Sequence, residues 1–424
     1  MRYPAYPTYK DSGDEWIKRI PSHWQIKKLK FLSSIQNSNV DKKTEDGELP
    51  VRLCNYVDVY KNDFINSEID FMVATATAEE MRRFKLRKDD VIITKDSESW
   101  DDIAVPACVE EDFDDVLCGY HLAQIRPKKS ELLGRYLFRC FSALGICNQF
   151  KVAANGVTRF GLPKDAIVSS VFPVPTFEEQ ECIAAFLDRK TARIDTLIAK
   201  KQRIIELLQE KRTVLISRAV TKGLDAGVQM KDSGVEWLGE IPAHWEVKRL
   251  KYAVTLQRGH DLPSDNREDG CVPIVSSAGV SGSHNKAAAK APGIVTGRYG
   301  TIGKFHIIEE DYWPLNTTLY SNNCHGNNVR YLWYMLQNIA EVFLVNSTKS
   351  AVPGVDRNDL HPTLIALPPT ATEQDAISSF LDGATAKLDG LSHKVNEAIE
   401  SLREYRSSLI CGAVTGKIDV RQEV

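Results

Sequence analysis

A glycine-rich stretch, GRYGTIGKF at residues 297–305, contains the residue types that come nearest to a phosphate-binding motif. The nucleotide-binding loop G-x-x-x-x-G-K-[ST] cradles phosphates with backbone N–H groups, and its hydroxyl residue binds Mg²⁺. Here the first glycine lies one position too early for that spacing, and Phe305 occupies the place of the hydroxyl residue. We therefore expect tight turns between strands, from which Arg298 and Lys304 could contact phosphates.

Other enzyme motifs are missing from the sequence. It contains no G-x-S-x-G, no H-E-x-x-H, no glycine-rich dinucleotide fingerprint and no D/N-P-P-[YFW] pattern of an adenine methyltransferase. The segment LPPT at residues 367–370 lacks both ends of the last pattern. The nine cysteines include no C-x-x-C pair and show no metal-ligand spacing, so we expect isolated reduced thiols and no metal site. A binding protein is a simpler interpretation than an enzyme.

Length and composition indicate a globular protein of two or more domains, with 424 residues, 43% hydrophobic and 26% charged. No run approaches the length of a membrane span, and MRYPAYPTYKDSG at the start lacks the apolar core of a signal peptide, so we expect a cytoplasmic location. The net charge of −3 hides an uneven distribution. Residues 189–222 contain ten Lys or Arg against three Asp or Glu, whereas residues 97–115 contain no Lys or Arg. This pattern fits an oriented contact with a polyanion, or two solvated faces.

The chain is internally duplicated. KDSGDEWIKRIPSHWQIKKLKF at residues 10–31 matches residues 231–252 at 13 of 22 positions, an offset of 221. Residues 178–221 match residues 372–415 at 21 of 44 positions, an offset of 194. The segment between the two repeats is therefore 27 residues longer in the first half. The repeated EW..IP.HW motif is expected to be structural, with tryptophan rings that anchor each domain entrance and Pro21 and Pro242 that set the turn.

The segments between the repeats, about residues 32–171 and 254–364, show little similarity to each other. Divergence after duplication explains this, as does selection for different targets. Both segments mix strand-like and helical patterns and predict α+β domains. The strand-like runs are DVIITK (90–95), GIVTG (293–297) and IALP (365–368), and the helical runs are residues 133–144 and 329–344.

The second repeat predicts a long helix in each half, about forty residues and roughly 60 Å long. Prolines mark the helix entries, at positions 173 and 175 and at positions 368 and 369. Counting in sevens gives Leu381, Leu388, Val395, Leu402 and Leu409, interleaved with Ile377, Ala384, Leu391, Ala398 and Tyr405. The first half gives Leu187, Ile194, Lys201, Leu208 and Leu215, with Ile183, Leu197 and Ile204, interrupted by Lys190 and Lys201 and flanked by Ile198 and Ile205. We expect these seams to pair with each other, the alternative being that each helix packs on its own domain.

The order of parts resembles the specificity subunits of type I restriction-modification systems. The resemblance is carried by PVPTFEEQECIAAFLD, LPPTATEQDAISSFLD and GRYGTIGK, and it covers essentially the whole chain. It implies an α+β chain with two mixed α/β target recognition domains, residues 1–175 and 229–366. It also implies a central helical spacer at residues 176–228 and a distal one at residues 367–424, paired antiparallel with pseudo-twofold symmetry.

The resemblance further implies a non-catalytic subunit that binds double-stranded DNA, each domain reading one half of a bipartite asymmetric site. Its implied partners are two methyltransferase subunits, which carry S-adenosylmethionine, and two ATP-driven restriction subunits. ATP and Mg²⁺ are expected in those partner subunits, and no cofactor is expected in this chain. A pseudo-twofold arrangement places half-site centres about 10 bp apart, roughly 34 Å. The alternatives are a nucleotide-hydrolysing enzyme that uses residues 297–304 and a coiled-coil scaffold that binds only proteins.

Residues that could contact DNA are those that offer hydrogen bonds to base edges and phosphates. In the first domain the candidates are Lys95, Ser97, Ser99, Tyr120, His121, Asn155, Thr158 and Arg159. In the second domain they are Ser283, His284, Asn285, Lys286, Arg298, Tyr299, Lys304, Asn316, Thr317, Thr318, Thr348, Lys349 and Ser350.

Overall fold

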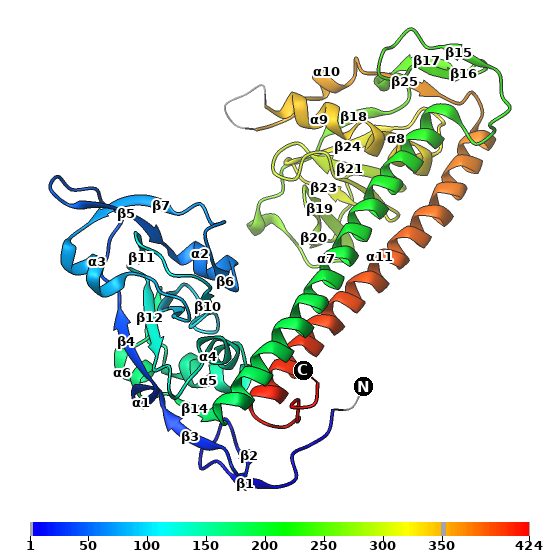
Figure 1. Cartoon of the computed structure of the whole chain (residues 1–424). Helices are drawn as coiled ribbons and strands as arrows, with labels where there is room; N and C mark the ends of the chain where they lie inside the picture. Colours follow the sequence, from blue (N-terminus) through cyan, green and yellow to red (C-terminus); the bar gives the residue numbers. More distant parts are fainter. Residues whose placement is uncertain (1–2, 349–352, 424) are drawn as a thin grey trace. The chain divides into compact units, whose positions relative to one another are not determined.

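The structure is a computed structural model that describes residues 3–348 and 353–423. Its contacts group the chain into unit 1, residues 1–200 with 397–424, and unit 2, residues 201–396. Each unit contains one mixed α/β domain and part of both long helices, α7 (Phe177–Lys222) and α11 (Ala371–Val414) (Figure 1). The four-part division expected from the sequence stays a prediction.

The domain of unit 1 is built on a five-stranded sheet in the order β4-β12-β8-β10-β6 and a three-stranded sheet in the order β11-β5-β7. Its strands are β1 (Tyr9–Asp11), β2 (Arg19–Pro21), β3 (Gln25–Lys28), β4 (Ser33–Asn37), β5 (Leu49–Cys54), β6 (Phe64–Ile65), β7 (Met72–Ala76), β8 (Val91–Thr94), β9 (Asp96–Ser97), β10 (Pro106–Val109), β11 (Val116–Cys118), β12 (Leu122–Pro127), β13 (Phe160–Gly161) and β14 (Val171–Val174). Its short helices are α1 (Leu29–Leu32), α2 (Tyr56–Lys61), α3 (Ala78–Phe84), α4 (Gly134–Phe141), α5 (Leu144–Ala153) and α6 (Lys164–Ser169).

The domain of unit 2 is built on a four-stranded sheet in the order β18-β24-β21-β22 and a three-stranded sheet in the order β20-β19-β23. Its strands are β15 (Met230–Asp232), β16 (Glu240–Pro242), β17 (Glu246–Arg249), β18 (Thr255–Arg258), β19 (Val272–Ser276), β20 (Gly279–His284), β21 (Gly293–Gly297), β22 (Phe305–Ile308), β23 (Trp313–Pro314), β24 (Thr318–Asn323) and β25 (Leu364–Leu367). Its short helices are η1 (Leu250–Tyr252), η2 (Ser264–Asn266), α8 (Val329–Asn338), α9 (Ala340–Ser347) and α10 (Arg357–Leu360).

The two domains share one strand topology although their sequences differ. In the larger sheets, β4, β12, β8 and β10 correspond in order and direction to β18, β24, β21 and β22. In the smaller sheets a central strand pairs antiparallel on one side and parallel on the other, β5 in unit 1 and β19 in unit 2. The connection from β5 to β7 takes 17 residues and contains α2 and β6, whereas β19 and β20 are joined by two residues. Insertions of this kind make the first domain longer.

The repeated opening motif is structural, as expected from the sequence. Trp24 and Trp245 are fully buried in the cores of their units. The other repeated tryptophan is less covered, and Trp237 remains 48% exposed. Each histidine of the motif forms a hydrogen bond with a helix glutamate: His23 with Glu179 at 2.9 Å and His244 with Glu373 at 3.1 Å. These contacts tie the domain entrance to the start of the long helix.

The glutamine that follows each of these glutamates is buried and fixes the start of its helix through a hydrogen bond to the preceding segment. Gln180 is 1% exposed, and its side-chain amide donates to the carbonyl of Pro175 at 3.3 Å. Gln374 is 2% exposed and donates to the carbonyl of Pro368 at 3.1 Å. A buried amide must be hydrogen-bonded, so this contact explains the glutamine in both copies of the Glu-Gln pair.

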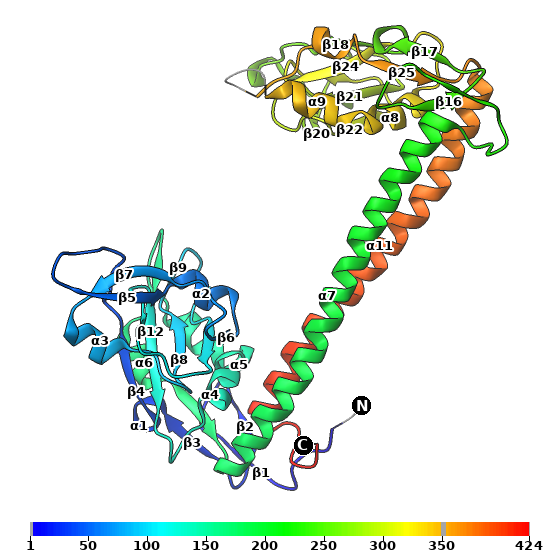
Figure 2. The same ribbon diagram turned by 45° about the horizontal axis from the view of Figure 1, so that its top comes forward.

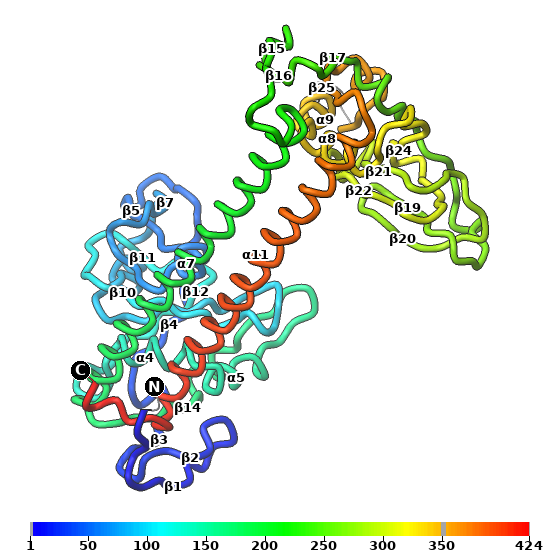
Figure 3. The backbone as a smooth tube through the Cα atoms, turned by 90° about the vertical axis from the view of Figure 1, so that its right-hand side faces the viewer, coloured from blue at the N-terminus to red at the C-terminus, as the bar shows by residue number. Residues whose placement is uncertain are grey.

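In each unit the two long helices pack against each other and run in opposite directions (Figure 3). In unit 1 the guanidinium of Arg406 lies 2.9 Å from the carboxylate of Asp195. In unit 2 the guanidinium of Arg212 lies 3.5 Å from the carboxylate of Asp389. Under the offset of 194, Asp195 matches Asp389 and Arg212 matches Arg406. The two ion pairs are therefore the same interaction with the helices exchanged, as antiparallel pairing of two similar helices requires.

One of the two expected series of seam residues is confirmed, and the other is shifted by one residue. The confirmed positions are buried or half-buried: Leu187, Ile194, Lys201, Leu208, Leu215, Leu381, Leu388, Val395, Leu402 and Leu409. Four residues of the other series are exposed by 41 to 46%, which corrects their expected role: Leu197, Ile204, Leu391 and Tyr405. Ile183 and Ile377 are buried within the domain cores.

In α11 the shift arises because the seam contains polar residues. The residues that follow the four exposed ones are half-buried: Ile198, Ile205, Ser392 and Arg406. Ser392 and Arg406 are polar, so their apolar neighbours Leu391 and Tyr405 fitted an apolar heptad pattern better than they did. Thr385 occupies another seam position, and its hydroxyl donates to the carbonyl of Leu381 at 2.7 Å. A hydroxyl satisfied within its own helix can be buried at low cost.

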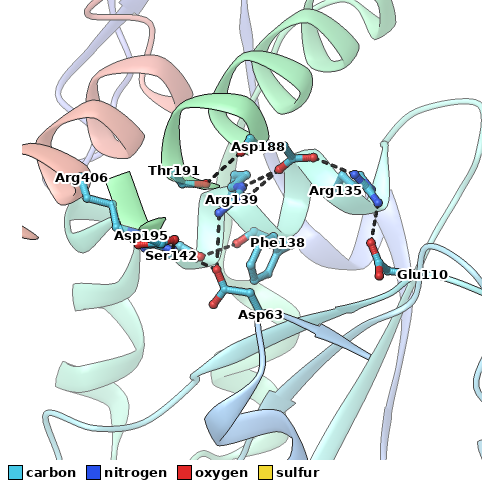
Figure 4. Close-up of polar contacts among 10 residues, drawn as sticks. All are labelled: Asp63, Glu110, Arg135, Phe138, Arg139, Ser142, Asp188, Thr191, Asp195 and Arg406. Atoms are coloured by element: carbon cyan, nitrogen blue, oxygen red, sulfur yellow. Dashed lines mark hydrogen bonds and ion pairs between the residues drawn. The ribbon is translucent and has the colours of Figure 1, made fainter. Parts of the chain in front are cut away.

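A charged cluster joins the domain of unit 1 to its long helix (Figure 4). Asp188 on α7 lies 2.8 Å from Arg135 and 2.6 Å from Arg139, which are both on α4. Arg139 is 1% exposed, and its guanidinium also lies 3.8 Å from Asp63. Arg135 also pairs with Glu110 at 2.7 Å. A buried guanidinium needs such carboxylates, so the cluster fixes α4 against α7.

Unit 2 contains the equivalent contact on α11. Asp382, which matches Asp188 in the repeat, accepts hydrogen bonds from Arg330 at 2.9 Å and from the hydroxyl of Tyr334 at 2.6 Å. Both partners lie on α8, which begins at the first residue of the predicted helical run 329–344. The rest of that run lies mainly in α9. One carboxylate on each long helix therefore holds the helix of its own domain.

Two features are absent from residues 3–348 and 353–423, the part of the chain that the structure describes. In this part of the chain no helix has the length and apolar character needed to cross a bilayer. Over the same residues no three His, Cys, Asp or Glu side chains are grouped closely enough to bind a metal ion.

Replacement of Asp188 by alanine is expected to destabilise unit 1 by about 3 to 5 kcal/mol, because it leaves the buried Arg139 without its main partner. The free energy of unfolding can be measured by urea denaturation followed through the fluorescence of tryptophans such as Trp24. Arg203→Ala is the matched control, since it removes an exposed pair with Glu206 and should cost less than about 1 kcal/mol. Equal stability of the two variants would contradict the anchoring role of Asp188.

Candidate nucleic-acid interface

Three loops of unit 1 meet at one end of the five-stranded sheet. Strand β9, in the loop after β8, pairs antiparallel with β13, in the turn that follows α5. His121, in the loop between β11 and β12, places Nδ1 2.8 Å from a carboxylate oxygen of Asp96 and 3.2 Å from the guanidinium of Arg159. We name the residues of these loops, 95–105, 119–121 and 154–163, the first loop cluster. All eight candidate DNA contacts of the first domain lie in it.

Lys95 and Tyr120 form one corner of the first loop cluster. The ammonium group of Lys95 donates to the carbonyl of Ser38 at 3.0 Å and lies 5.0 Å from the ring centre of Tyr120. Burial lowers the pKa of Lys95, and the neighbouring carboxylate of Asp96 acts in the opposite direction. Tyr120 is 50% exposed and packs edge-on against the ring of His121. Lys95 thus supports an aromatic ring that faces solvent.

A pocket of about 520 Å³ opens between these loops. Its lining contains three carboxylates, those of Asp96, Glu98 and Asp102, beside His121 and Arg159. Carboxylates accept hydrogen bonds from the cytosine amino group, and arginine donates to guanine, so this lining suits base edges. The same carboxylates would repel phosphates, so this lining does not suit a phosphate-binding site.

Two exposed large hydrophobic residues of the first loop cluster were not among the candidates. Trp100 is 54% exposed, and Val157, between Gly156 and Thr158 in the NGVTRF turn, is 92% exposed. Asn155, Thr158 and Arg159 are also exposed along this turn. The candidates were chosen for hydrogen bonding, and that criterion passes over tryptophan and valine. An isolated tryptophan in an acidic, turn-rich run was the available signal.

Unit 2 brings together the topologically equivalent loops. The backbone N–H groups of Arg298 and Tyr299, which follow β21, donate to the carbonyl of Thr317 at 2.8 and 3.2 Å. Tyr299 forms an isolated bridge with Gly354, in the segment after α9. The guanidinium of Arg298 lies 4.7 Å from the ring centre of Tyr299. We name the described residues of these loops, 298–304, 315–317, 348 and 353–356, the second loop cluster.

The GRYGTIGK stretch forms the first loop of this cluster and joins two strands, β21 and β22. A nucleotide-binding loop leads instead into a helix, whose N-terminus supplies the phosphate-binding N–H groups. Gly300 and Gly303 adopt φ values of +73° and +79°, which glycine tolerates best. Lys304 is exposed at the end of the loop. The expected turns between strands are confirmed.

Some candidates have structural contacts. Ser97 and His284 are each 6% exposed, and Thr318 is fully buried with its hydroxyl donating to the carbonyl of Leu315. In this conformation Thr318 cannot reach a base edge. The hydroxyl of Thr348 donates to the carbonyl of Val345 at 2.9 Å. Lys349 and Ser350 lie outside the described residues.

The remaining candidates of unit 2 are more accessible. Ser283, Asn285 and Lys286 are exposed at the end of β20, and the side chain of Asn285 donates to Glu268. Asn316 is half-buried and donates to Asp261. A DNA contact by any of these residues stays a prediction.

Comparison with known proteins agrees with this architecture. A family profile described as "Type I restriction modification DNA specificity domain" matches residues 21–207 and 242–401. The putative type I restriction enzyme MjaX specificity subunit of Methanocaldococcus jannaschii is 25% identical over 430 aligned residues, which cover 96% of each chain. The type I restriction enzyme EcoBI specificity subunit of Escherichia coli is 20% identical over 71% of this chain and 69% of its own length.

Two solved structures share the fold. One is a chain of an assembly described as "Structural basis underlying complex assembly and conformational transition of the type I R-M system", with a TM-score of 0.72, 14% identity and coverage of 93% of this chain and 98% of that one. The other is the HsdS subunit of Thermoanaerobacter tengcongensis, with a TM-score of 0.53, 16% identity and coverage of 94% and 98%. Because the family profile matches most of the chain in two copies, this protein belongs to the DNA specificity subunits of type I restriction-modification systems.

Proposed function

We propose that the first and second loop clusters each read one half of a bipartite, asymmetric DNA target. The observation that carries this proposal is that two domains of one topology present dissimilar loops at equivalent positions. The first loop cluster offers Arg159, His121 and a set of carboxylates, whereas the second offers Arg298 and Lys304 on a glycine-rich loop. Different hydrogen-bonding groups on one scaffold suit different base sequences.

The long helices serve as the spacer of this target. The seam and the exchanged ion pairs, Asp195 with Arg406 and Asp389 with Arg212, support one antiparallel register in both units. A rigid helical element then relates the two half-sites by its length. Neither alternative from the sequence is favoured, because the glycine-rich loop leads into a strand and the family is one of DNA specificity.

The chain acts as a non-catalytic subunit in the cytoplasm. Its proposed partners are double-stranded DNA, two methyltransferase subunits and, in the full complex, restriction subunits. S-adenosylmethionine, ATP and Mg²⁺ belong to those partners in this proposal, and this chain supplies sequence recognition. The family membership and the DNA specificity domains support a role in such a complex.

Removal of one heptad from both helices is expected to shorten the recognised spacer and leave both half-sites unchanged. Deletion of residues 198–204 together with 397–403 keeps the seam in phase and shortens the helices by roughly 10 Å, up to about 3 bp of duplex. Methylome sequencing of cells that carry the deleted chain and its methyltransferase partner gives the spacer. An unchanged spacer in an active complex would contradict the helical spacer.

Arg159→Ala and Arg298→Ala are expected to relax base preference in different halves of the target. Loss of one arginine contact to a base edge costs about 1 to 3 kcal/mol, and the loss should appear at positions within one half-site only. Fluorescence anisotropy with duplexes substituted base by base measures this effect. Arg203→Ala, exposed on α7, is the control and should leave base preference unchanged. A change in both half-sites from one substitution would refute the assignment.

DNA affinity is expected to fall steeply with salt, because bound cations release counterions from the duplex. Six phosphate contacts would weaken binding roughly a thousandfold between 50 and 200 mM salt. The dissociation constant of the assembled complex, measured across this range on a target duplex, tests the prediction. A flat response would argue against a phosphate-binding surface.

A further inference from the structure

Each unit exposes an aromatic side chain at the end of the repeated opening segment. Phe31 is 60% exposed and Tyr252 is 58% exposed, and the two residues match under the offset of 221. A lysine precedes each of them, and a cation lies three positions before each. We name these residues the Lys–aromatic patches: Lys28, Lys30 and Phe31 in unit 1, and Arg249, Lys251 and Tyr252 in unit 2.

The backbone holds the two patches in the same local geometry. Leu29 is fully buried, and its N–H donates to the carbonyl of Ser170 at 2.8 Å. Leu250 is fully buried, and its N–H donates to the carbonyl of Thr363 at 2.8 Å. With the leucine anchored inside, the aromatic residue two positions later faces solvent.

A lysine lies over each exposed ring. The ammonium group of Lys30 is 5.1 Å from the ring centre of Phe31, and that of Lys251 is 4.7 Å from the ring centre of Tyr252. In unit 1 Lys128 adds a further cation, since it donates to the carbonyl of Phe31 at 2.9 Å. Each patch is therefore an apolar ring within a positively charged border.

Packing explains the match of buried residues between the repeats but not the match of exposed ones. A single exposed aromatic residue is ordinary on a protein surface. Two exposed aromatic residues at the same repeat position, each with cations one and three positions before it, are not explained by either core. The exposed residues of the two loop clusters differ between the units. Surface residues have therefore diverged where no common function, or a different function in each unit, acted on them. A shared ligand accounts for the retained patches.

The patches lie away from the loop clusters within each unit. In unit 1, β4 begins just after α1 and ends next to Ser38, the residue that binds Lys95 of the first loop cluster. In unit 2, β18 begins just after η1 and ends next to Gly259, which donates to Thr318 beside the second loop cluster. Each strand separates patch from loops by about 13 to 17 Å. Figure 2 shows α1 and β9 at opposite ends of the domain of unit 1.

We propose that the two Lys–aromatic patches dock two copies of one protein subunit, one copy on each unit. An exposed ring bordered by cations fits a partner with an apolar pocket and a carboxylate rim. DNA is the weaker candidate, because phosphates would bind the lysines of a patch and would leave the ring of Phe31, which has no hydrogen-bonding group, without a contact. The inference rests on the proposed function only in identifying this subunit as the methyltransferase subunit.

The test is the stoichiometry and affinity of the complex between the full chain and its methyltransferase subunit. Native mass spectrometry of the wild-type complex should show two copies of that subunit for each chain. Phe31→Ala and Tyr252→Ala should each weaken one of the two binding steps at least tenfold, and the double variant should weaken both. Lys30→Glu with Lys251→Glu should have the same effect through reversed charge.

Val152→Ala is the control, since this residue is 70% exposed and lies outside both repeated segments. It should bind two copies with wild-type affinity, and circular dichroism should show that all variants fold. A double variant that still binds two copies with unchanged affinity would overturn the proposal. Retention of both copies with loss of DNA affinity would overturn it in favour of DNA contacts. A wild-type chain that binds no methyltransferase subunit would overturn the proposed function as well.

Discussion

One carboxylate on each long helix governs how its domain is held. Asp188 accepts hydrogen bonds from Nε and Nη2 of the buried guanidinium of Arg139, and Asp382 accepts from Arg330 and Tyr334. Since a buried cation without its carboxylate is costly, the domain helix cannot shift along the long helix without losing this contact. The loops at the end of each sheet therefore take their position from the long helix. A change in the helix is passed to the loop cluster of each unit through a short and rigid set of contacts.

The register between the helices depends on a second polar interaction. Asp195 with Arg406 and Arg212 with Asp389 satisfy each other across the seam in their respective units. A slip of one heptad would separate both pairs and would place charged side chains against apolar ones. Apolar seam residues supply most of the burial, but leucines alone would permit several registers. The polar residues restrict the helices to one of them.

The sequence was most informative where residues recur. The duplicated opening and the heptads predicted both long helices, and the paired Glu-Gln motif marked their starts. The second seam series was wrong in α11 because Arg406 and Ser392 are polar. A heptad pattern read from one sequence assigns polar residues to the exposed face of a helix. The common topology of the two domains was not visible, because loops of unequal length and different composition hide equivalent strands. Trp100 was missed because its exposure depends on the fold around it.

The two loop clusters are attached to strands that do not depend on them. Eleven residues follow β8 before the next strand of the sheet, and seven follow β21, yet the sheets keep the same order. Substitutions on such exposed loops typically change stability by no more than about 0.5 kcal/mol. Each loop cluster can therefore change in sequence without repacking a core, and one cluster can change while the other is retained. Under the proposed function, a few surface substitutions would give the chain a new base preference in one half of its target.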